Sequence, residues 1–550
     1  MKYIYLLVSA LAFHCQSTAQ GTPQSQRADV NVSFVMNVSS LCSRLAMDPA
    51  TNMLYYITSI GNVHKIDLGS NNDELLYTAA DHGITYLQGL AFKDNSMILV
   101  GNSYVDSTGA IGKIIRGQLN GAGGRDWSVI AQTEVYPTSH TYYDHGYSGV
   151  AVNPTGDSLY INSGSRTDHG ELQDNGGKYP GAREVPLTSA ILRIPLNAQN
   201  LVLSNDATLL APYLFADGTR NSFDLAFMGN KYLIAPENSG DRDDPDELNW
   251  IQQGRHYGFP WQMGNDDTPQ QYSPYDPNAD VYINHKCSAY KKGFFRNDPN
   301  YPPKPAGVTF TAPIRNNGPD ADKMRDGTTG KVKDGSDMGT GAFTFTPHRS
   351  PLGLIFDNDN ILAGDLQGDG FMLSFNKGGD SLGLTPGGAP AAILDASQDM
   401  LHLKFANQGG SFTVSSTKII TGFANPVDAC MIGNIAYVIE YNSGGNGRLF
   451  KITFPKAQAS GVQDGERAYS VSMYPNPCAD RITFKCNGPG RVKPELFIYD
   501  LEGRRLMSAR NEGILDNQVS LSTAELQNGI YFYTMQVNGD VVKGKFTVLK

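Results

Sequence analysis

The stretch that decides the fold reads SGVAVNPTGDSLYINSG and runs from Ser148 to Gly164. It joins a short apolar segment, a turn of Asn, Pro, Thr, Gly and Asp, and a second segment rich in Leu, Tyr and Ile. Short apolar runs bounded by turn-forming residues are typical of β-strands. The stretch therefore predicts two antiparallel strands joined by a tight turn.

The same pattern occurs five more times along the chain. The further copies span 41–59, 88–102, 222–238, 351–366 and 426–441. Each copy is followed, at a variable distance, by a third segment that often begins with Gly and carries a basic residue. Examples are 61–68, 112–119, 189–196, 370–376 and 447–454. Six such units predict an all-β chain whose main part is a six-bladed β-propeller. An array of β-sandwiches is the competing architecture.

Two insertions interrupt the repeat, near 165–187 and at about 262–340. The longer one is rich in Pro, Asn, Asp, Gly and Tyr and has no periodicity, which indicates either an ordered irregular rim or a mobile loop. Because insertions in a rigid repeat become loops, and loops on a scaffold carry function, both are of functional interest.

Composition limits the possible classes of protein. A chain of 550 residues predicts two or three domains, and an apolar content of 40% excludes wholesale disorder. The formal net charge of −10 argues against nucleic acid as a partner, because phosphate binding needs a basic surface.

The N-terminus predicts export. A basic start at Lys2 precedes the apolar stretch 4–13, which is too short to span a bilayer, and small residues at 17–19 suit a cleavage site. We therefore interpret 1–19 as a secretory signal peptide. A lipoprotein anchored through Cys15 is disfavoured, because Phe13 and His14 are bulky where small residues are required. No later segment is a candidate transmembrane helix.

The remaining cysteines are scattered, which makes a zinc site improbable on spacing grounds; they are Cys42, Cys287, Cys430, Cys478 and Cys486. Cys478 and Cys486 flank one short predicted strand. They form either a disulfide in an oxidising compartment or two buried thiols.

We expect the propeller over 30–456, a polar linker over 457–469 and a small β-sandwich over 470–550. The last segment contains YPNP (474–477), IYDLEGR (498–504), LQNGIYF (526–532) and KGKF (543–546). It resembles the C-terminal sorting domain of the type IX secretion system. The resemblance implies the secretion machinery as a partner, export across the outer membrane, and release or surface anchoring. An accessory immunoglobulin-like module is the alternative.

Asp144 and His145 stand just before the strand pair at 148–164. Loops that lead into propeller strands face the central channel, so an imidazole there can reach a ligand. Neutral His is a suitable general base near pH 7 if a neighbour fixes its tautomer. The alternative for an isolated His is that it only caps a turn.

Arg220 and Asn221 hold the same place before the copy at 222–238. An Arg fork suits planar carboxylates or quinone oxygens, and Asn can both donate and accept. The alternative is a structural salt bridge from Arg220 to a carboxylate such as Asp217.

Five carboxylates lie within the seven residues from Asp241 to Glu247. Such density is costly unless a cation or solvent relieves the repulsion, and calcium prefers carboxylate and carbonyl oxygens. The alternative is a solvated acidic turn.

The order of these motifs resembles the soluble, pyrroloquinoline-quinone-dependent glucose/sorbosone and aldose sugar dehydrogenases. The matching stretches are DH with SGV (144–150), TRNSF (219–223), DELN (246–249) and YGFPW (257–261). The resemblance spans about 40–455. It implies a propeller that binds the quinone and Ca²⁺, oxidises a sugar at its anomeric carbon, and passes electrons to an external acceptor.

The resemblance also implies roles for single residues. His145, beside Asp144, would take the proton of the anomeric hydroxyl while a hydride passes to the quinone; Arg220 would polarise the quinone and Asn221 would contact it. The implied metal ligands are Ser239 and Gly240 for a calcium that bridges to the cofactor, and Asp246, Glu247 and Tyr257 for a second calcium.

The chain departs from this family at several positions. Ser165 stands where a carboxylate supports the catalytic His, although Asp168 follows closely and is a further catalytic candidate. Gln367 aligns with a Lys that faces the quinone carboxylates, and 423–426 lacks the later Arg pair. His348 and Arg349 could replace part of this charge.

These observations predict a secreted or surface-located, quinone- and calcium-dependent sugar dehydrogenase. A non-catalytic carbohydrate-binding propeller without the quinone, and a calcium-dependent propeller hydrolase or lactonase, are the alternatives.

Overall fold

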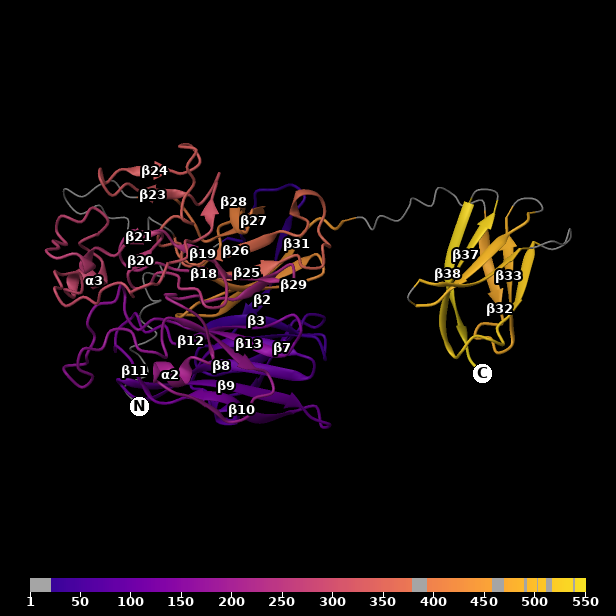
Figure 1. Cartoon of the computed structure of the whole chain (residues 1–550), viewed down its shortest axis with the longest axis horizontal. Coiled ribbons are helices and arrows are strands. Elements are labelled where there is room, and N and C mark those ends of the chain that lie inside the picture. Colours follow the sequence, from indigo (N-terminus) through magenta and orange to yellow (C-terminus); the bar gives the residue numbers. More distant parts are fainter. Residues whose placement is uncertain are drawn as a thin grey trace. The chain divides into compact units, whose positions relative to one another are not determined.

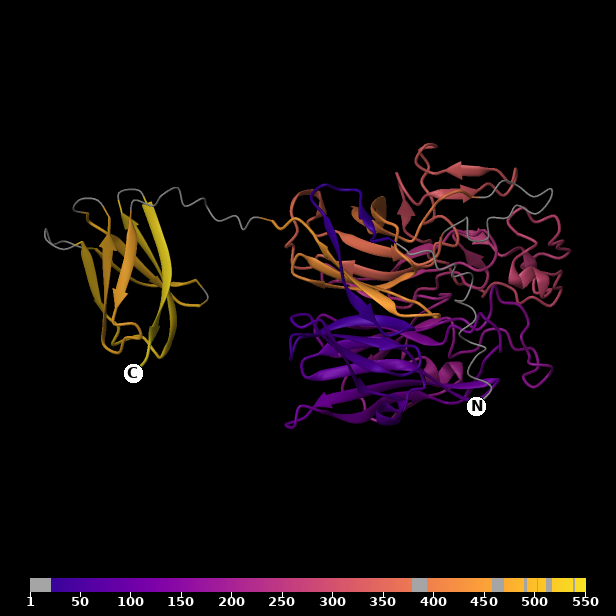
Figure 2. The same ribbon diagram turned by 180° about the vertical axis from the view of Figure 1, so that it is seen from behind.

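The chain divides into two compact units, Met1–Ala457 and Gln458–Lys550, which Figures 1 and 2 show from opposite sides. The computed structural model describes residues 21–377, 393–457, 469–488, 492–501, 503–510, 517–537 and 540–550. The chain is 47% strand and 4% helix, so the all-β prediction is confirmed. The predicted signal peptide and most of the predicted linker lie outside the described residues.

The described part of the large unit contains six sheets of three or more strands, built mainly from antiparallel strands, and two small two-stranded sheets in the insertion. The first three are β3 (Cys42–Asp48), β4 (Met53–Thr58), β5 (Val63–Asp67) and β6 (Asn72–Tyr77); β7 (Tyr86–Lys93), β8 (Ser96–Asp106), β9 (Gly109–Leu119) and β10 (Arg125–Thr133), with β11 (Tyr136–Pro137) and β15 (Leu201–Leu203) at their edges; and β12 (Tyr147–Val152), β13 (Ser158–Ser163), β14 (Ala190–Pro195) and β16 (Leu214–Asp217).

The other three sheets complete the set. They are β17 (Ala226–Met228), β18 (Tyr232–Glu237) and β19 (Glu247–Ile251); β25 (Pro351–Phe356), β26 (Gly370–Ser374), β27 (Asp399–Gln408) and β28 (Ser411–Thr421), with β1 (Gln24–Ser25) and β22 (Arg315–Asn316); and β29 (Pro426–Ile432), β30 (Ile435–Glu440), β31 (Gly447–Thr453) and β2 (Asn31–Val38).

The first strands of these sheets pack against one another in a closed ring. β3 contacts β7, β7 contacts β12, β18 contacts β25, β25 contacts β29, and β29 contacts β3. An apolar cluster that includes Ala151, Leu225 and Ala235 joins the third sheet to the fourth. The last sheet is completed by β2, which pairs with β31. This arrangement is that of a β-propeller, and apolar clusters fill the spaces between neighbouring sheets.

The structure corrects the fifth repeat. We predicted that 351–366 would form a strand pair, but β25 pairs with β26, and the stretch between them is a loop with the short 3₁₀ helix η3 (Gly364–Leu366). Asp357 stabilises this loop by accepting bonds from the backbone N–H groups of Ile361, Leu362 and Gly368. Leu362 is buried as a loop residue. The true partner strand is the segment that we had predicted as the third.

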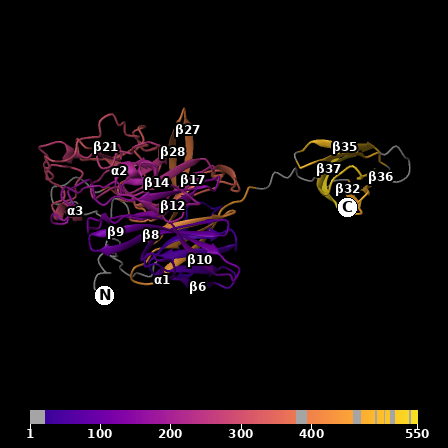
Figure 3. The same cartoon turned by 60° about the horizontal axis from the view of Figure 1, so that its bottom comes forward.

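The insertion predicted at 262–340 is largely irregular and gathers on one side of the large unit (Figures 1 and 2). Its short elements are β20 (Gln262–Met263), β21 (Asp266–Asp267), η2 (Pro269–Gln271), α3 (Ser288–Lys291), β22, β23 (Lys323–Arg325) and β24 (Val332–Asp334). The other helices, α1 (Ala79–His82) and α2 (Ala207–Leu210), are single turns (Figure 3). In the described ranges, no helix is long and apolar enough to cross a membrane.

The small unit is a β-sandwich, as predicted. Its two sheets are β32 (Ser470–Tyr474), β33 (Arg481–Asn487) and β36 (Gln518–Ser522), and β35 (Arg505–Arg510), β34 (Glu495–Tyr499), β37 (Gly529–Val537) and β38 (Asp540–Val548). Phe484, Ile498 and Phe546 lie in the core between them. Cys478 and Cys486 are buried free thiols, which is the second of the two alternatives we left open.

Candidate functional site

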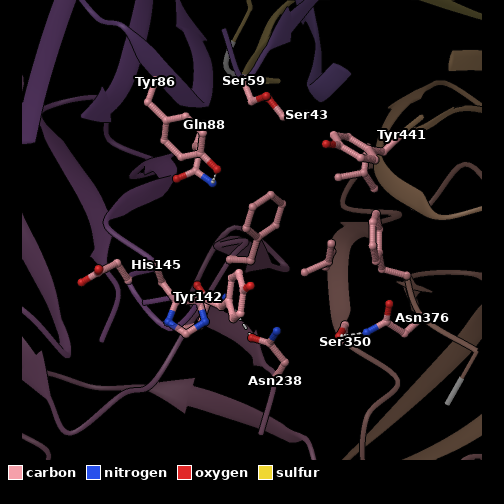
Figure 4. A pocket seen from close by; sticks show the side chains of 16 residues that line it. Ser43, Ser59, Tyr86, Gln88, Tyr142, His145, Asn238, Ser350, Asn376 and Tyr441 are labelled. Atoms are coloured by element: carbon pink, nitrogen blue, oxygen red, sulfur yellow. Dashed lines mark hydrogen bonds between the residues drawn. The ribbon is translucent and has the colours of Figure 1, made fainter. Parts of the chain in front are cut away.

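A cavity of about 230 Å³ lies at one end of the ring, and all six sheets contribute to its lining. The lining residues stand in or before the first strand of each sheet or just after the second, and their side chains surround the cavity (Figure 4). Five aromatic rings form much of the wall: Tyr86, Tyr142, Phe223, Phe375 and Tyr441. The remaining polar lining is mostly Ser, Asn and Gln, with Asp144 and His145 as its titratable Asp and His.

His145 lies in the cavity wall with a defined tautomer. Its Nδ1 is 3.2 Å from the carbonyl oxygen of Ser165 and 3.1 Å from the hydroxyl oxygen of the same residue. The hydroxyl donates to the carbonyl of Thr167, so both Ser165 oxygens accept from Nδ1–H. Burial and the charge of Arg220 lower the pKa of His145 to about 3. The imidazole is therefore neutral at pH 7, and Nε2 is the nitrogen that can take up a proton.

Asp144 lines the same cavity and is a second titratable group there. Its carboxylate accepts from the backbone N–H of Ser139 at 2.6 Å and of Thr141 at 3.3 Å. Burial outweighs these bonds and raises the pKa of Asp144 to about 6. Its charge therefore changes close to physiological pH, whereas that of His145 does not.

Arg220 lies behind the lining and is buried. Its guanidinium donates to the carbonyl oxygens of Asp168, Asn238 and Ser239 at 2.9–3.0 Å, and to the Asp168 carboxylate at 3.2 Å. Our alternative of a structural salt bridge is thus realised, but with Asp168 and not with Asp217. Asp168 also bonds to His169 and to the Asp241 N–H, and it does not line the cavity. Both residues therefore support the wall from behind the lining residues.

Asn221 does line the cavity. Its Nδ2 donates to Oδ1 of Asn238 at 2.9 Å, while its own Oδ1 is buried and has no hydrogen-bond partner among the described residues. Gln88, on β7, shows the same feature, because its Oε1 is buried without a partner in the described structure. Two lining residues therefore each carry a buried acceptor without a partner in the described structure.

Three predicted cofactor ligands lie outside the cavity lining. His348 bonds to Asp243 at 2.8 Å, and Arg349 is fully buried between Asp395 and Asp399 at 2.5–2.7 Å. Gln367 is exposed in the loop between β25 and β26, at the end of these strands that is remote from the cavity. It was misplaced because our alignment treated 361–366 as the second strand of its repeat.

The predicted metal ligands are engaged by protein groups in this structure. Asp246 accepts from the N–H and hydroxyl of Ser239 and from the N–H of Ser350. The Ser239 carbonyl faces Arg220, and a Cβ on Gly240 would meet the Asp168 carboxylate at 2.7 Å. The Tyr257 hydroxyl donates to Trp250 O at 2.6 Å. In the described ranges, no cluster of three or more His, Cys, Asp or Glu side chains is placed to hold a metal ion.

Most of the acidic run at 241–247 is satisfied by protein groups. Asp241 accepts from the Tyr143 hydroxyl, Asp243 pairs with Arg325 and His348, and Asp244 pairs with Arg242. The inserted segment supplies the Arg325 side chain and the backbone N–H of Ala289, which donates to Asp241, so the run helps to anchor the insertion to the propeller. The run is therefore not a solvated acidic turn, and calcium binding here stays a prediction.

Glu247 instead faces another carboxylate, Glu237, across β18 and β19. Burial, then repulsion by Glu237, holds the pKa of Glu247 well above its ordinary value of 4.5. A raised pKa means that the folded state favours the protonated form. This stabilisation is complete below pH 4.5 and is lost as pH rises through the raised value.

Between pH 5 and pH 8, the free energy of unfolding is therefore expected to fall less in Glu247→Gln than in the wild type. The measurement is the free energy of unfolding in urea at both pH values. Glu74→Gln, on the exposed side of β6, is the matched control and should leave the pH dependence unchanged. An unaltered pH dependence in Glu247→Gln would show that Glu247 is ionised throughout.

Several lining residues were missed by our sequence reasoning, including Gln88, Ser350 and Asn376. The position within the repeat could have identified Gln88. It begins the second repeat copy, and His145 and Asn221 lie just before the third and fourth copies. The start of each copy marks the cavity end of the ring.

Comparisons with known proteins agree with the sequence motifs. Residues 85–286 match the Glucose / Sorbosone dehydrogenase family model, and residues 472–549 match the Secretion system C-terminal sorting domain. The resemblance to the glucose/sorbosone dehydrogenases is confirmed. The match supports an oxidoreductase that acts on a sugar, and the tail supports type IX secretion. A comparison with curated proteins finds no match.

Among the solved structures that this chain matches is the apo form of the soluble aldose sugar dehydrogenase from Escherichia coli. The match has 14% sequence identity and a TM-score of 0.45, and it covers 77% of this chain and 99% of that chain. Two structures described as glucose dehydrogenase match at 14% identity, with TM-scores of 0.46 and 0.47 and coverage of 78% and 76% of this chain and 99% of theirs.

In the glucose/sorbosone dehydrogenases the implied cofactor carries three carboxylates, which require donors and positive charge. Here the described residues that line the cavity include no Lys or Arg. The segment 378–392, outside the described residues, contains none either. A lining without cations does not fit the three carboxylates of pyrroloquinoline quinone.

Proposed function

We propose that this chain is an exported sugar dehydrogenase whose mouth cavity binds a neutral sugar and whose general base is His145. This proposal rests on one observation: a neutral imidazole of fixed tautomer lies in a cavity lined mainly by uncharged polar and aromatic side chains. Aromatic walls suit the apolar faces of a sugar ring, and amide and hydroxyl groups suit its hydroxyls.

The proposed reaction oxidises one carbon of the sugar, and the resemblance favours the anomeric carbon. The hydroxyl proton passes to Nε2 of His145, the C–H hydride passes to an external two-electron acceptor of the quinone or phenazine class, and a C=O bond forms. Ser165 accepts a hydrogen bond from Nδ1–H of His145. The imidazolium that forms keeps this hydrogen bond. A pKa of about 3 keeps Nε2 unprotonated at neutral pH but makes it a weak base. The rate enhancement by general-base catalysis is therefore expected at the low end of the usual range of about 10²–10⁴-fold.

Calcium stays a prediction from the resemblance, and pyrroloquinoline quinone is not proposed as a resident oxidant, because neither finds a matching donor set in the described residues. Export rests on the sorting-domain match at 472–549 and on the predicted signal peptide. We propose that the mature chain is secreted or held at the cell surface.

The test is dye reduction by the purified full-length chain with a panel of aldoses, with and without added quinone and calcium. We expect sugar-dependent reduction of a phenazine-type dye. Reduction under none of these conditions would reject the dehydrogenase.

The second candidate is a carbohydrate-binding propeller without catalysis, which the absence of Lys and Arg from the lining favours. It is distinguished by sugar binding without dye reduction. A hydrolase has less support, because Asp144 is the one Asp or Glu in the described lining and is held by two backbone N–H groups.

A further inference from the structure

A short basic stretch of the insertion borders the cavity. The sequence NHKCSAYKKGFFRN (284–297) contains three Lys and one Arg but no Asp or Glu, in a chain whose formal net charge is −10. The four cations are exposed; they are Lys286, Lys291, Lys292 and Arg296. We call these four residues the basic rim.

The charge of the basic rim is available to a partner. Elsewhere in the insertion, Lys304, Arg325 and Lys333 form ion pairs with Asp residues. Within the part of the chain that the structure describes, no carboxylate forms such a pair with the basic rim. Lys377, which directly follows the lining residue Asn376, is a further exposed cation. Exposed and unpaired positive charge on an acidic protein favours an anionic partner.

Lys292 connects the basic rim with the cavity. Its Nζ lies 4.2 Å from the ring centroid of Tyr142, which lines the cavity and is 38% exposed. The backbone N–H of Ala289 and the hydroxyl of Tyr143 both donate to the Asp241 carboxylate at 2.8 Å. The basic stretch and the loop that supplies Tyr142 are therefore held together by one buried group.

The charges beneath and inside the cavity do not offer a place for an anion. Arg44 stacks 3.8 Å from the ring centroid of the lining residue Phe223, and its Nη1 is buried without a hydrogen bond to any described residue. The carboxylates of Asp224 and Asp428 lie 3.6 and 3.8 Å from this nitrogen and compensate its charge. The lining itself carries Asp144. We therefore expect the anionic groups of a ligand at the basic rim and a neutral group in the cavity.

Aromatic rings accompany the cations and indicate what kind of anion fits. Tyr142 is exposed at the cavity, and Tyr290 and Phe294 are half-buried within the basic stretch. Aromatic faces suit sugar rings and cations suit carboxylates, so the combination favours an acidic saccharide over an acidic protein. The cavity volume of about 230 Å³ lies below the roughly 300–1,000 Å³ of drug-sized ligand pockets, so further rings of an oligosaccharide would lie outside it.

We infer that the basic rim binds an acidic oligosaccharide, whose uronate carboxylates pair with the rim cations while a neutral ring at one end enters the cavity. This inference rests on the sugar of the proposed function and assigns its substrate class. Tyr142 lies between the two parts of the site, because its ring contacts Lys292 and also lines the cavity.

Binding is tested on the full-length chain by isothermal titration with three probes. They are a hyaluronan hexasaccharide, which has a neutral reducing end and several glucuronates, its carboxyl methyl ester, and a glutamate peptide of equal charge. We expect the acidic saccharide to bind about tenfold more tightly than either other probe, because exposed ion pairs add to the contacts of the sugar rings. Its advantage over the ester should shrink in about 0.5 M NaCl, which screens exposed charges.

A four-site variant removes the basic rim. Its substitutions are Lys286→Gln, Lys291→Gln, Lys292→Gln and Arg296→Gln. It should bind the ester as the wild type does and lose the preference for the acid. Lys292→Gln alone is a second variant, and it should lose part of this preference. The matched control changes the net charge equally at exposed cations elsewhere on the large unit and should keep the preference; its substitutions are Lys231→Gln, Arg255→Gln, Lys404→Gln and Lys456→Gln.

Three results would overturn the inference. They are the lack of any preference of the wild type for the acid over the ester, equal losses in the two four-site variants, and peptide binding as tight as that of the acidic saccharide, which would indicate a surface for acidic proteins. The dehydrogenase proposal fails separately. Preferential binding of the acidic saccharide without dye reduction by any sugar would reject the dehydrogenase alone, and dye reduction by neutral aldoses without that preference would reject this inference alone.

Discussion

Replacement of His145 by Ala is expected to reduce the rate of sugar-dependent dye reduction by about 10²-fold, the low end of the usual contribution of a positioned general base, because a pKa of about 3 makes the imidazole a weak base. The imidazole is the neutral nitrogen base of the cavity, and Ala offers no acceptor in its place. Sugar affinity should fall far less, because the aromatic and uncharged polar lining remains. The measurement is kcat and KM for the best aldose, with the free energy of unfolding as a check on folding.

His140→Ala is the matched control, since His140 is exposed in the same loop. It should retain the wild-type rate. A loss of less than threefold in His145→Ala would contradict its role as the base. Partial recovery of the rate with added imidazole would distinguish a lost base from a distorted cavity.

The pH profile provides a further check on the same residue. Because the pKa of His145 is about 3, its protonation should not lower the rate between pH 5 and pH 8. Asp144, with a pKa of about 6, is the lining group expected to change the rate near pH 6, and Asp144→Asn should remove that change.

Arg349→Met is expected to lower the free energy of unfolding of the large unit by about 3–5 kcal/mol. Arg349 is fully buried, with Nη1 2.7 Å from Asp395 and Nη2 2.5 Å from Asp399. Its loss leaves Asp399 as a buried carboxylate without its cation. The measurement is urea unfolding followed by tryptophan fluorescence.

Lys418→Met is the matched control for Arg349→Met. Lys418 also pairs with Asp395, at 2.6 Å, but its side chain is 20% exposed, so water can replace it. We expect a smaller loss of stability there. The double variant Arg349→Met with Asp399→Asn should recover part of the loss, and equal effects of Arg349→Met and Lys418→Met would contradict a buried ion pair.

The sequence predicted the fold well where the strand repeats were clean. In the copies at 88–102 and 148–164 both strands appear as expected, because apolar runs and turn residues agree on one local structure. The copy at 351–366 failed because two apolar segments, 361–366 and 370–376, could each pair with β25. The side chain of Asp357 decides between them by holding the first segment in a loop, and no local pattern reveals that bond.

The site was predictable in position but not in chemistry. His145 and Asn221 line the cavity because the repeat places them at its mouth. The partners of Arg220, His348 and Arg349 could not be foreseen, because Asp168, Asp243 and Asp399 are distant in sequence and are brought near by packing. An Arg that looks available for a ligand in the sequence is thus paired with carboxylates in the fold.

The pairing of β2 with β31 joins segments 418 residues apart, as in the contact between Ser33 and Lys451. The ring, and with it a cavity lined from every sheet, can close only after β31 has become available. A nascent or partly translocated chain therefore has no complete binding site, and this late, long-range closure predicts slow folding. Ligand binding thereby reports on the completion of folding, and the sorting tail follows directly after the strand that makes closure possible.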